Sequence, residues 1–102
     1  MEKYNTIERI HENIIMARDL YVNGTNDIIS FLEETTDEIV DLSNAVRNEF
    51  LALRRWTKFL DPTNEELVED MYEYSIYVVS RCGELKAIGD EAAVRYQSDG
   101  VN

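Results

Sequence analysis

Residues that interrupt helices are scarce in this sequence, which has one proline and four glycines among 102 residues. Because proline and glycine most often end or bend regular elements, a chain with so few of them is expected to form long, uninterrupted elements. The sequence also lacks a run of about 18 apolar residues, the length that spans a bilayer. It therefore predicts no membrane insertion.

Cysteine and basic residues are scarce as well. The one cysteine, Cys82, cannot form an internal disulfide, which fits a reducing, cytoplasmic setting. Ten Lys and Arg residues against 21 Asp and Glu give a net charge of −11. Phosphate binding needs a basic surface, so this charge disfavours nucleic acid as a partner. It permits binding to a cation or to a basic protein, and it permits mimicry of a nucleic-acid backbone.

Apolar residues recur at helical spacing through nearly the whole chain, and no alternating strand pattern competes with them. The predicted helices span residues 2–21, 26–60 and 64–97. We expect the first helix to end in the NGTN turn around Gly24. Pro62 should end the second helix, and Thr63 with Glu66 forms the capping-box pattern that would open the third.

Helix lengths and short connections predict how these helices pack. At 1.5 Å per residue the second and third helices would each be about 50 Å long and the first about 30 Å. The predicted fold is all-α: an elongated antiparallel three-helix bundle, with one shorter helix packed on a long helical hairpin, in a single domain of residues 1–102. The first helix should cover the hairpin end that lies away from Pro62.

The hairpin end near Pro62 carries more apolar side chains than two helices can hide. Exposed apolar patches of this kind usually mark a partner surface, so we expect a homodimer or a contact with another protein there. The residues expected in this surface are Phe50, Trp56, Phe59, Tyr72 and Tyr77. Around them, ion pairs of Lys58 with Glu66 and of Arg55 with Glu69 would join the two helices.

A row of carboxylates suggests a second kind of site. Glu33, Asp37 and Asp41 lie four residues apart, on one face of a helix. In the predicted hairpin they lie near residues 83–90 of the facing helix, and carboxylates on facing helices are how bundles bind metals. The candidate ligands of a divalent or iron-type metal are Glu33, Asp37, Asp41, Glu84 and Asp90. An ordinary solvated face is the alternative, and Lys86 could neutralise the same carboxylates.

Two glycines lie seven residues apart in the same region. Gly83 and Gly89 fall inside the third predicted helix, where a glycine costs about 1 kcal/mol relative to alanine. We expect both to allow close approach of a neighbouring helix. The sequence has no nucleophile elbow, phosphate-binding glycine loop or zinc-ligand pattern, so it predicts no catalytic residues and no enzyme.

The order of these elements resembles one three-helix repeat of the PhoU-like proteins. DEIVDLSNAVRNEFLALRR, a helix break and a long helix ending in SRCGELKAIGDEAA carry the resemblance. The matching positions are Glu33, Asp37, Asp41, Leu53, Arg54, Arg55, Glu84, Leu85, Ile88, Gly89, Asp90 and Ala92. The resemblance implies a cytoplasmic, non-enzymatic regulator of phosphate uptake and signalling that binds a transporter or sensor kinase, with metal at its acidic motifs. Such proteins carry two repeats, which a homodimer of this chain would supply.

An acidic inhibitor is the alternative from another class. A small acidic protein, for instance one encoded by a phage, would bind a basic surface of a host protein and could mimic DNA. The two interpretations differ in where the carboxylates lie. A PhoU-like module should gather Asp37, Asp41 and Asp90 at one place, whereas a mimic should spread its acids over an exposed face.

Overall fold

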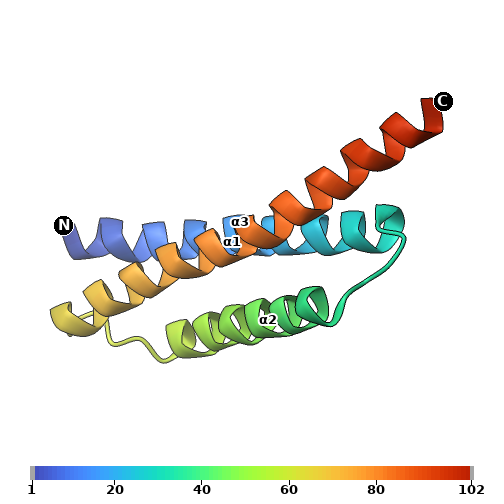
Figure 1. Ribbon diagram of the computed structural model, residues 1–102. Helices are drawn as coiled ribbons and strands as arrows, with labels where there is room; N and C mark the ends of the chain where they lie inside the picture. The colour runs from blue at the N-terminus through green and yellow to red at the C-terminus, as the bar shows by residue number, and fades with distance from the viewer. Residues whose placement is uncertain (1, 102) are drawn as a thin grey trace.

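The computed structural model describes the backbone of residues 2–101 and the side chains of residues 5–98, and this part of the chain forms three helices without a strand. The helices are α1 (Glu2–Phe31), α2 (Asp37–Lys58) and α3 (Glu65–Val101). The chain is therefore an all-α three-helix bundle, as predicted (Figure 1). It is elongated, with extents of 58 × 25 × 15 Å.

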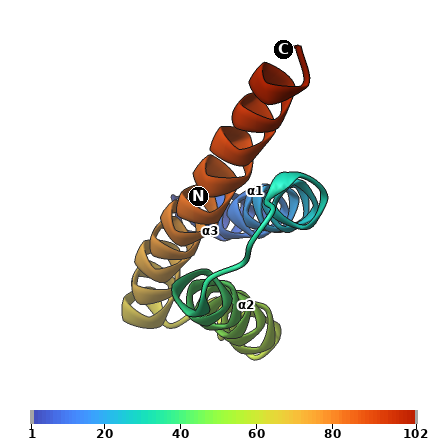
Figure 2. The same cartoon turned by 45° about the vertical axis from the view of Figure 1, so that its right-hand side comes forward.

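Helix α1 packs mainly against α3, and the two helices run in the same direction (Figures 1 and 2). Between them the Asn13 amide donates a hydrogen bond to the buried Ser75 hydroxyl, with 3.0 Å between Nδ2 and Oγ. Helix α2 runs in the opposite direction along one side of this pair and makes fewer contacts with it. The last turns of α3 extend beyond the end of α1 (Figure 1).

The first break in the chain lies at residues 32–36 and not at the NGTN segment. Gly24 is inside α1. The predicted end of the first helix at residue 21 and the predicted start of the second at residue 26 were therefore wrong. A Cβ atom on Gly24 would lie 2.9 Å from the Lys86 backbone of α3. The glycine is therefore needed where two helices touch, and it does not form a turn. The Thr25 hydroxyl donates to the Tyr21 carbonyl within the same helix.

Helix α2 therefore begins later than predicted. Thr36 is its N-cap, and the Thr36 hydroxyl accepts a hydrogen bond from the Ile39 amide at 3.3 Å. The longer α1 reaches both ends of the bundle. Ile7 and Ile10, near its beginning, belong to the same apolar core as Met71, so the expectation that the first helix leaves the Pro62 end uncovered was wrong.

The second connection begins with a local turn and ends with a cap. The Asp61 carboxylate accepts hydrogen bonds from the Thr63 hydroxyl and amide, at 2.7 and 2.9 Å, and these bonds lower the pKa of Asp61. Asn64 caps α3, because its side-chain oxygen accepts from the Leu67 amide at 3.1 Å. Thr63 is thus part of the turn, and the capping box predicted from Thr63 and Glu66 was wrong.

The core runs along the line where the helices meet. Its buried residues recur at three- and four-residue steps, as expected for helices that bury one face. They are Ile10, Ala17, Ile28, Val46, Phe50, Leu53, Val68, Met71, Val78, Cys82 and Leu85. Helices α1 and α2 each contribute three of them, but α2 makes the fewest contacts with the other helices. It is therefore the least embedded helix, and hollows lie on both of its sides.

Candidate protein-binding groove

An apolar groove lies between the last turns of α2 and the first turns of α3. It consists of two adjoining hollows of about 270 and 380 Å³, which share Trp56, Leu67 and Met71. The other lining residues are Ala52, Arg55, Phe59, Leu60, Asp70 and Tyr74. The groove is open to solvent at the end of the bundle that holds the second connection.

Two aromatic side chains project from the α2 side of this groove. The Trp56 side chain is 63% exposed and Phe59 is 81% exposed, although Leu53, one turn earlier, is fully buried. Phe59 is the C-cap residue of α2, and its amide donates to the Trp56 carbonyl at 3.1 Å. The helix thus ends with two large apolar groups on its outer side, which is a feature of partner surfaces.

Three of the five residues predicted for a partner surface lie on or next to the groove. Trp56 and Phe59 line it, and Tyr77 stacks on the lining residue Tyr74 with 6.0 Å between ring centroids. Phe50 is 7% exposed and belongs to the core, where the Arg54 guanidinium lies 5.9 Å from its ring centroid. Its inclusion in an exposed surface was wrong.

Tyr72, the fifth predicted residue, is half-buried against the core. Leu60 and Leu67 also line the groove, although neither was expected in the partner surface. Leu67 lies four residues before Met71 on the same face of α3, which is the signal that could have found it.

The two rims of the groove carry opposite charge. Arg55 lines the α2 side, and Asp70 lines the α3 side. Glu66 and Glu73 lie four residues before and three after Asp70, on the same side of α3, and both are exposed. Within residues 5–98, Arg55 and Asp70 form no ion pair, and neither of the predicted pairs, Lys58 with Glu66 and Arg55 with Glu69, is present.

Next to the groove, a polar network ties the middle of α2 to α3. Arg81 Nε lies 3.1 Å from Glu49 Oε1, and Arg81 Nη1 lies 2.9 Å from Glu84 Oε2. The Tyr74 hydroxyl donates to the Glu49 main-chain carbonyl at 3.1 Å. The Glu49 carboxylate raises the pKa of Arg81 and of the nearby Tyr77 phenol. This network fixes the helix from which Trp56 projects.

The five predicted metal ligands do not come together. No group of three His, Cys, Asp or Glu side chains within the described residues could hold a metal ion. The beginning of α2 lines a hollow of about 350 Å³ with α1. Asp37 and Asp41 are exposed, and within the described residues neither forms an ion pair with residues 83–90.

The two candidate ligands on α3, Glu84 and Asp90, have basic partners. Lys86 pairs with Asp90 and lies 3.6 Å from Asp27 of α1. The pair with Asp90 raises the pKa of Lys86, burial lowers it, and Asp27 raises it further, so the net change is a rise. Lys86 therefore neutralises Asp27 and Asp90 and does not reach Asp37 or Asp41, while Glu84 is paired with Arg81.

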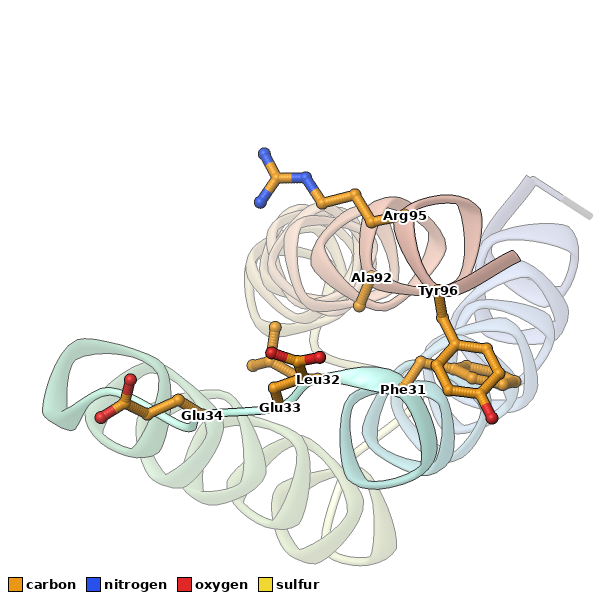
Figure 3. A pocket seen from close by; sticks show the side chains of 7 residues that line it. All are labelled: Phe31, Leu32, Glu33, Glu34, Ala92, Arg95 and Tyr96. Atoms are coloured by element: carbon orange, nitrogen blue, oxygen red, sulfur yellow. The ribbon is translucent and has the colours of Figure 1, made fainter. Parts of the chain in front are cut away.

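Another hollow, of about 420 Å³, lies at the opposite end of the bundle (Figure 3). Its lining residues are Phe31, Leu32, Glu33, Glu34, Ala92, Arg95 and Tyr96. The rings of Phe31 and Tyr96 contact each other with 5.2 Å between centroids. Arg95 points away from Glu33 and Glu34 and pairs with Glu91 at 2.6 Å. The polar groups of this hollow thus do not converge on a common point.

Comparison of the chain with protein-family models, with curated proteins and with solved structures finds no match. The resemblance to PhoU-like proteins stays a prediction from the sequence. Among the described residues, none of the helices is both long and apolar enough to cross a bilayer.

Proposed function

We propose that this chain is a non-enzymatic binding and regulatory module of PhoU-like type that acts through protein contacts. The groove beside Trp56 and Phe59 is its contact surface. The observation that carries the proposal is the exposure of these two aromatic side chains over an apolar hollow with an arginine at its rim. Trp, aromatic and Arg side chains dominate the energetics of protein interfaces.

The PhoU-like interpretation adds two finer proposals. One is self-association, because two copies would supply the two repeats of that family. The other is regulation of phosphate uptake through a transporter or a sensor kinase. The acidic outer surface remains available to such a partner when the groove is occupied, since Asp37 and Asp41 lie at the beginning of α2 and Trp56 lies near its end.

Photo-crosslinking in cells tests the groove. A benzophenone-bearing phenylalanine analogue at position 59 should give a covalent adduct with a polypeptide after irradiation. The matched control is the same analogue at Ile29, which is 80% exposed and lies near the end of α1. That end of α1 is opposite the second connection, where the groove lies (Figure 1). Equal adduct yields at both positions, or none at position 59, would contradict the proposal.

The acidic inhibitor is the second candidate, and the positions of the carboxylates favour it. Asp37 and Asp41 are exposed and are not gathered with Asp90, which is the arrangement expected of a spread acidic face. An inhibitor of this kind should bind a basic, DNA-binding protein with an affinity that falls steeply with salt. Competition against DNA, with Asp37→Asn/Asp41→Asn as the variant and Asp19→Asn as the control, distinguishes it from the first candidate.

A further inference from the structure

The chain exposes more surface than a compact monomer of its mass. Its solvent-accessible area is 7165 Å², whereas a compact monomer of 11.9 kDa exposes about 5,950 Å². The difference is about 1,200 Å². A standard interface buries about 800 Å² on each partner, and homodimer interfaces often bury more. The excess is comparable in size with the area that one protomer of a stable homodimer would bury.

The chemistry of the groove is self-complementary. One rim is basic through Arg55, the other is acidic through Asp70, and the floor between them is apolar. The exposed Glu66 lies one turn before Asp70 on α3 and adds to the acidic side. When two such grooves face each other across a two-fold axis, α2 of each copy lies over α3 of the other. The basic rim of each copy then meets the acidic rim of its partner, and the Trp56 side chains become buried between them.

The charges on the rims are available for this contact. Arg55 and Asp70 are both exposed and, within the described residues, neither forms an ion pair in its own chain. Arg81, by contrast, is already bound to Glu49 and Glu84. Arg55 and Asp70 are therefore free to pair with a second copy, while the pair of Arg81 with Glu49 holds α2 against α3.

We propose that the occupant of the groove is a second copy of this chain, bound in an isologous, two-fold contact in which Arg55 of each copy pairs with the partner's Asp70. This inference rests on the proposed function, since it names the partner of the same groove. The partner surface is the same groove on an identical chain. A different protein in the groove is an outcome that the experiments below would detect.

Mass and fluorescence test the association first. Sedimentation velocity of the purified chain should give twice 11.9 kDa at micromolar concentrations. Trp56 is the only tryptophan, and its side chain is 63% exposed in the single chain. Its emission should shift to shorter wavelength as concentration rises through the dissociation constant. A monomer at all concentrations up to about 1 mM, the weakest association that such an interface would show, overturns the inference.

A charge swap tests the pairing itself. Arg55→Glu places a carboxylate opposite the partner's Asp70, and Asp70→Arg places a guanidinium opposite the partner's Arg55. Each variant alone should therefore dimerise about tenfold or more weakly. Mixing the two variants should restore a heterodimer, because one of its two contacts then joins unchanged partners and the other joins the exchanged charges. The double variant R55E/D70R should dimerise with itself, since both of its contacts join opposite charges. Only a contact between chains predicts this pattern.

Matched controls exclude general effects of charge. Arg47→Glu and Glu69→Arg make the same charge changes on α2 and α3 at exposed positions. Glu69 lies two residues from both Leu67 and Met71, so it points away from the groove. These controls should leave the dissociation constant within about threefold of the original value, and circular dichroism should show all variants equally helical. Dimerisation that is insensitive to Arg55 and Asp70, or equally sensitive to the controls, overturns the inference.

The outcomes separate this inference from the proposed function. A crosslink from position 59 to a different protein, combined with a monomeric purified chain, rejects the second copy and keeps the groove as a binding surface. A monomeric chain that also gives no crosslink rejects both. A crosslinked product of twice the chain mass, lost in Arg55→Glu and recovered on mixing with Asp70→Arg, supports both.

Discussion

Gly24 of α1 and Gly89 of α3 meet backbone to backbone. A Cβ atom on Gly89 would lie 2.8 Å from the Gly24 carbonyl oxygen, and one on Gly24 would lie 2.9 Å from Lys86 Cα. Gly83, seven residues before Gly89 in the sequence, has open space where its Cβ would be, with no atom within 4 Å. The expectation of close approach was confirmed for Gly89 and was wrong for Gly83.

Alanine substitutions at these glycines should have opposite effects on stability. Gly24→Ala and Gly89→Ala should each lower the free energy of unfolding by about 1 to 3 kcal/mol, because backbone atoms must move apart. Gly83→Ala should raise it by about 0.5 to 1 kcal/mol through its better helix propensity. Urea unfolding followed by circular dichroism measures all three, and Gly83→Ala is the matched control.

Removing Arg81 should destabilise the contact between α2 and α3. The Glu49 and Arg81 side chains are only 19% and 24% exposed, so Arg81→Met leaves a largely buried carboxylate without its partner. We expect a loss of about 1 to 2 kcal/mol, less than for a fully buried pair. The double variant Glu49→Gln/Arg81→Met should recover part of this loss in thermal unfolding. Equal or greater destabilisation in the double variant would contradict a role for charge pairing.

The stability of the fold should fall at high pH, because the thiol of Cys82 is buried. Burial, and then the Glu49 carboxylate, raise the pKa of Cys82 from 9.0 to about 11. The unfolded chain therefore loses this proton first, and stability should fall as pH rises from 9 to 11. We expect a loss of about 1 kcal/mol between about pH 8 and about pH 10. In Cys82→Ala the overall stability is lower, but this part of the pH dependence should disappear.

The stability of the chain should depend on the N-cap residue Asn64 and only weakly on Thr63. Asn64→Ala removes the acceptor for the Leu67 amide and should cost about 1 kcal/mol. Thr63→Ala removes one exposed hydrogen bond to Asp61 and should cost less than half as much. Denaturant midpoints of the two variants, compared at equal m-values, check this order. A larger effect at Thr63 would restore the capping box that the sequence predicted.

The buried residues of a helix were predictable from the sequence where the spacing of apolar residues alone decides which face is buried. Met71, Val78, Cys82 and Leu85 follow one another at helical spacing in the predicted third helix, and all four are buried. The turn at NGTN was not predictable in the same way. Glycine has the same local signature whether it permits a turn or a helix contact, and only the packing of α1 on α3 distinguishes the two for Gly24.

The true break at residues 32–36 lacks both glycine and proline. Its local signal is Thr36 followed by Asp37 and Glu38, an N-cap residue with acids in the first turn, which is weaker than the glycine of NGTN. That error hid the second half of α1, which lines a hollow with the beginning of α2. The carboxylate cluster assumed that this part of α2 faced α3 alone, and the carboxylates did not come together. The groove depended only on the short connection at Pro62 and on the surplus of aromatic residues around it, and so Trp56 and Phe59 were found.

The shared direction of α1 and α3 limits how two such units could be joined in one chain. The beginning of α1 and the end of α3 lie at opposite ends of a molecule 58 Å long (Figure 1). If two copies meet at the groove end, a covalent tandem must return along this length. At about 3.3 Å per residue, the joining peptide needs at least about 18 residues. A gene duplication without such a spacer would tether the two grooves out of each other's reach.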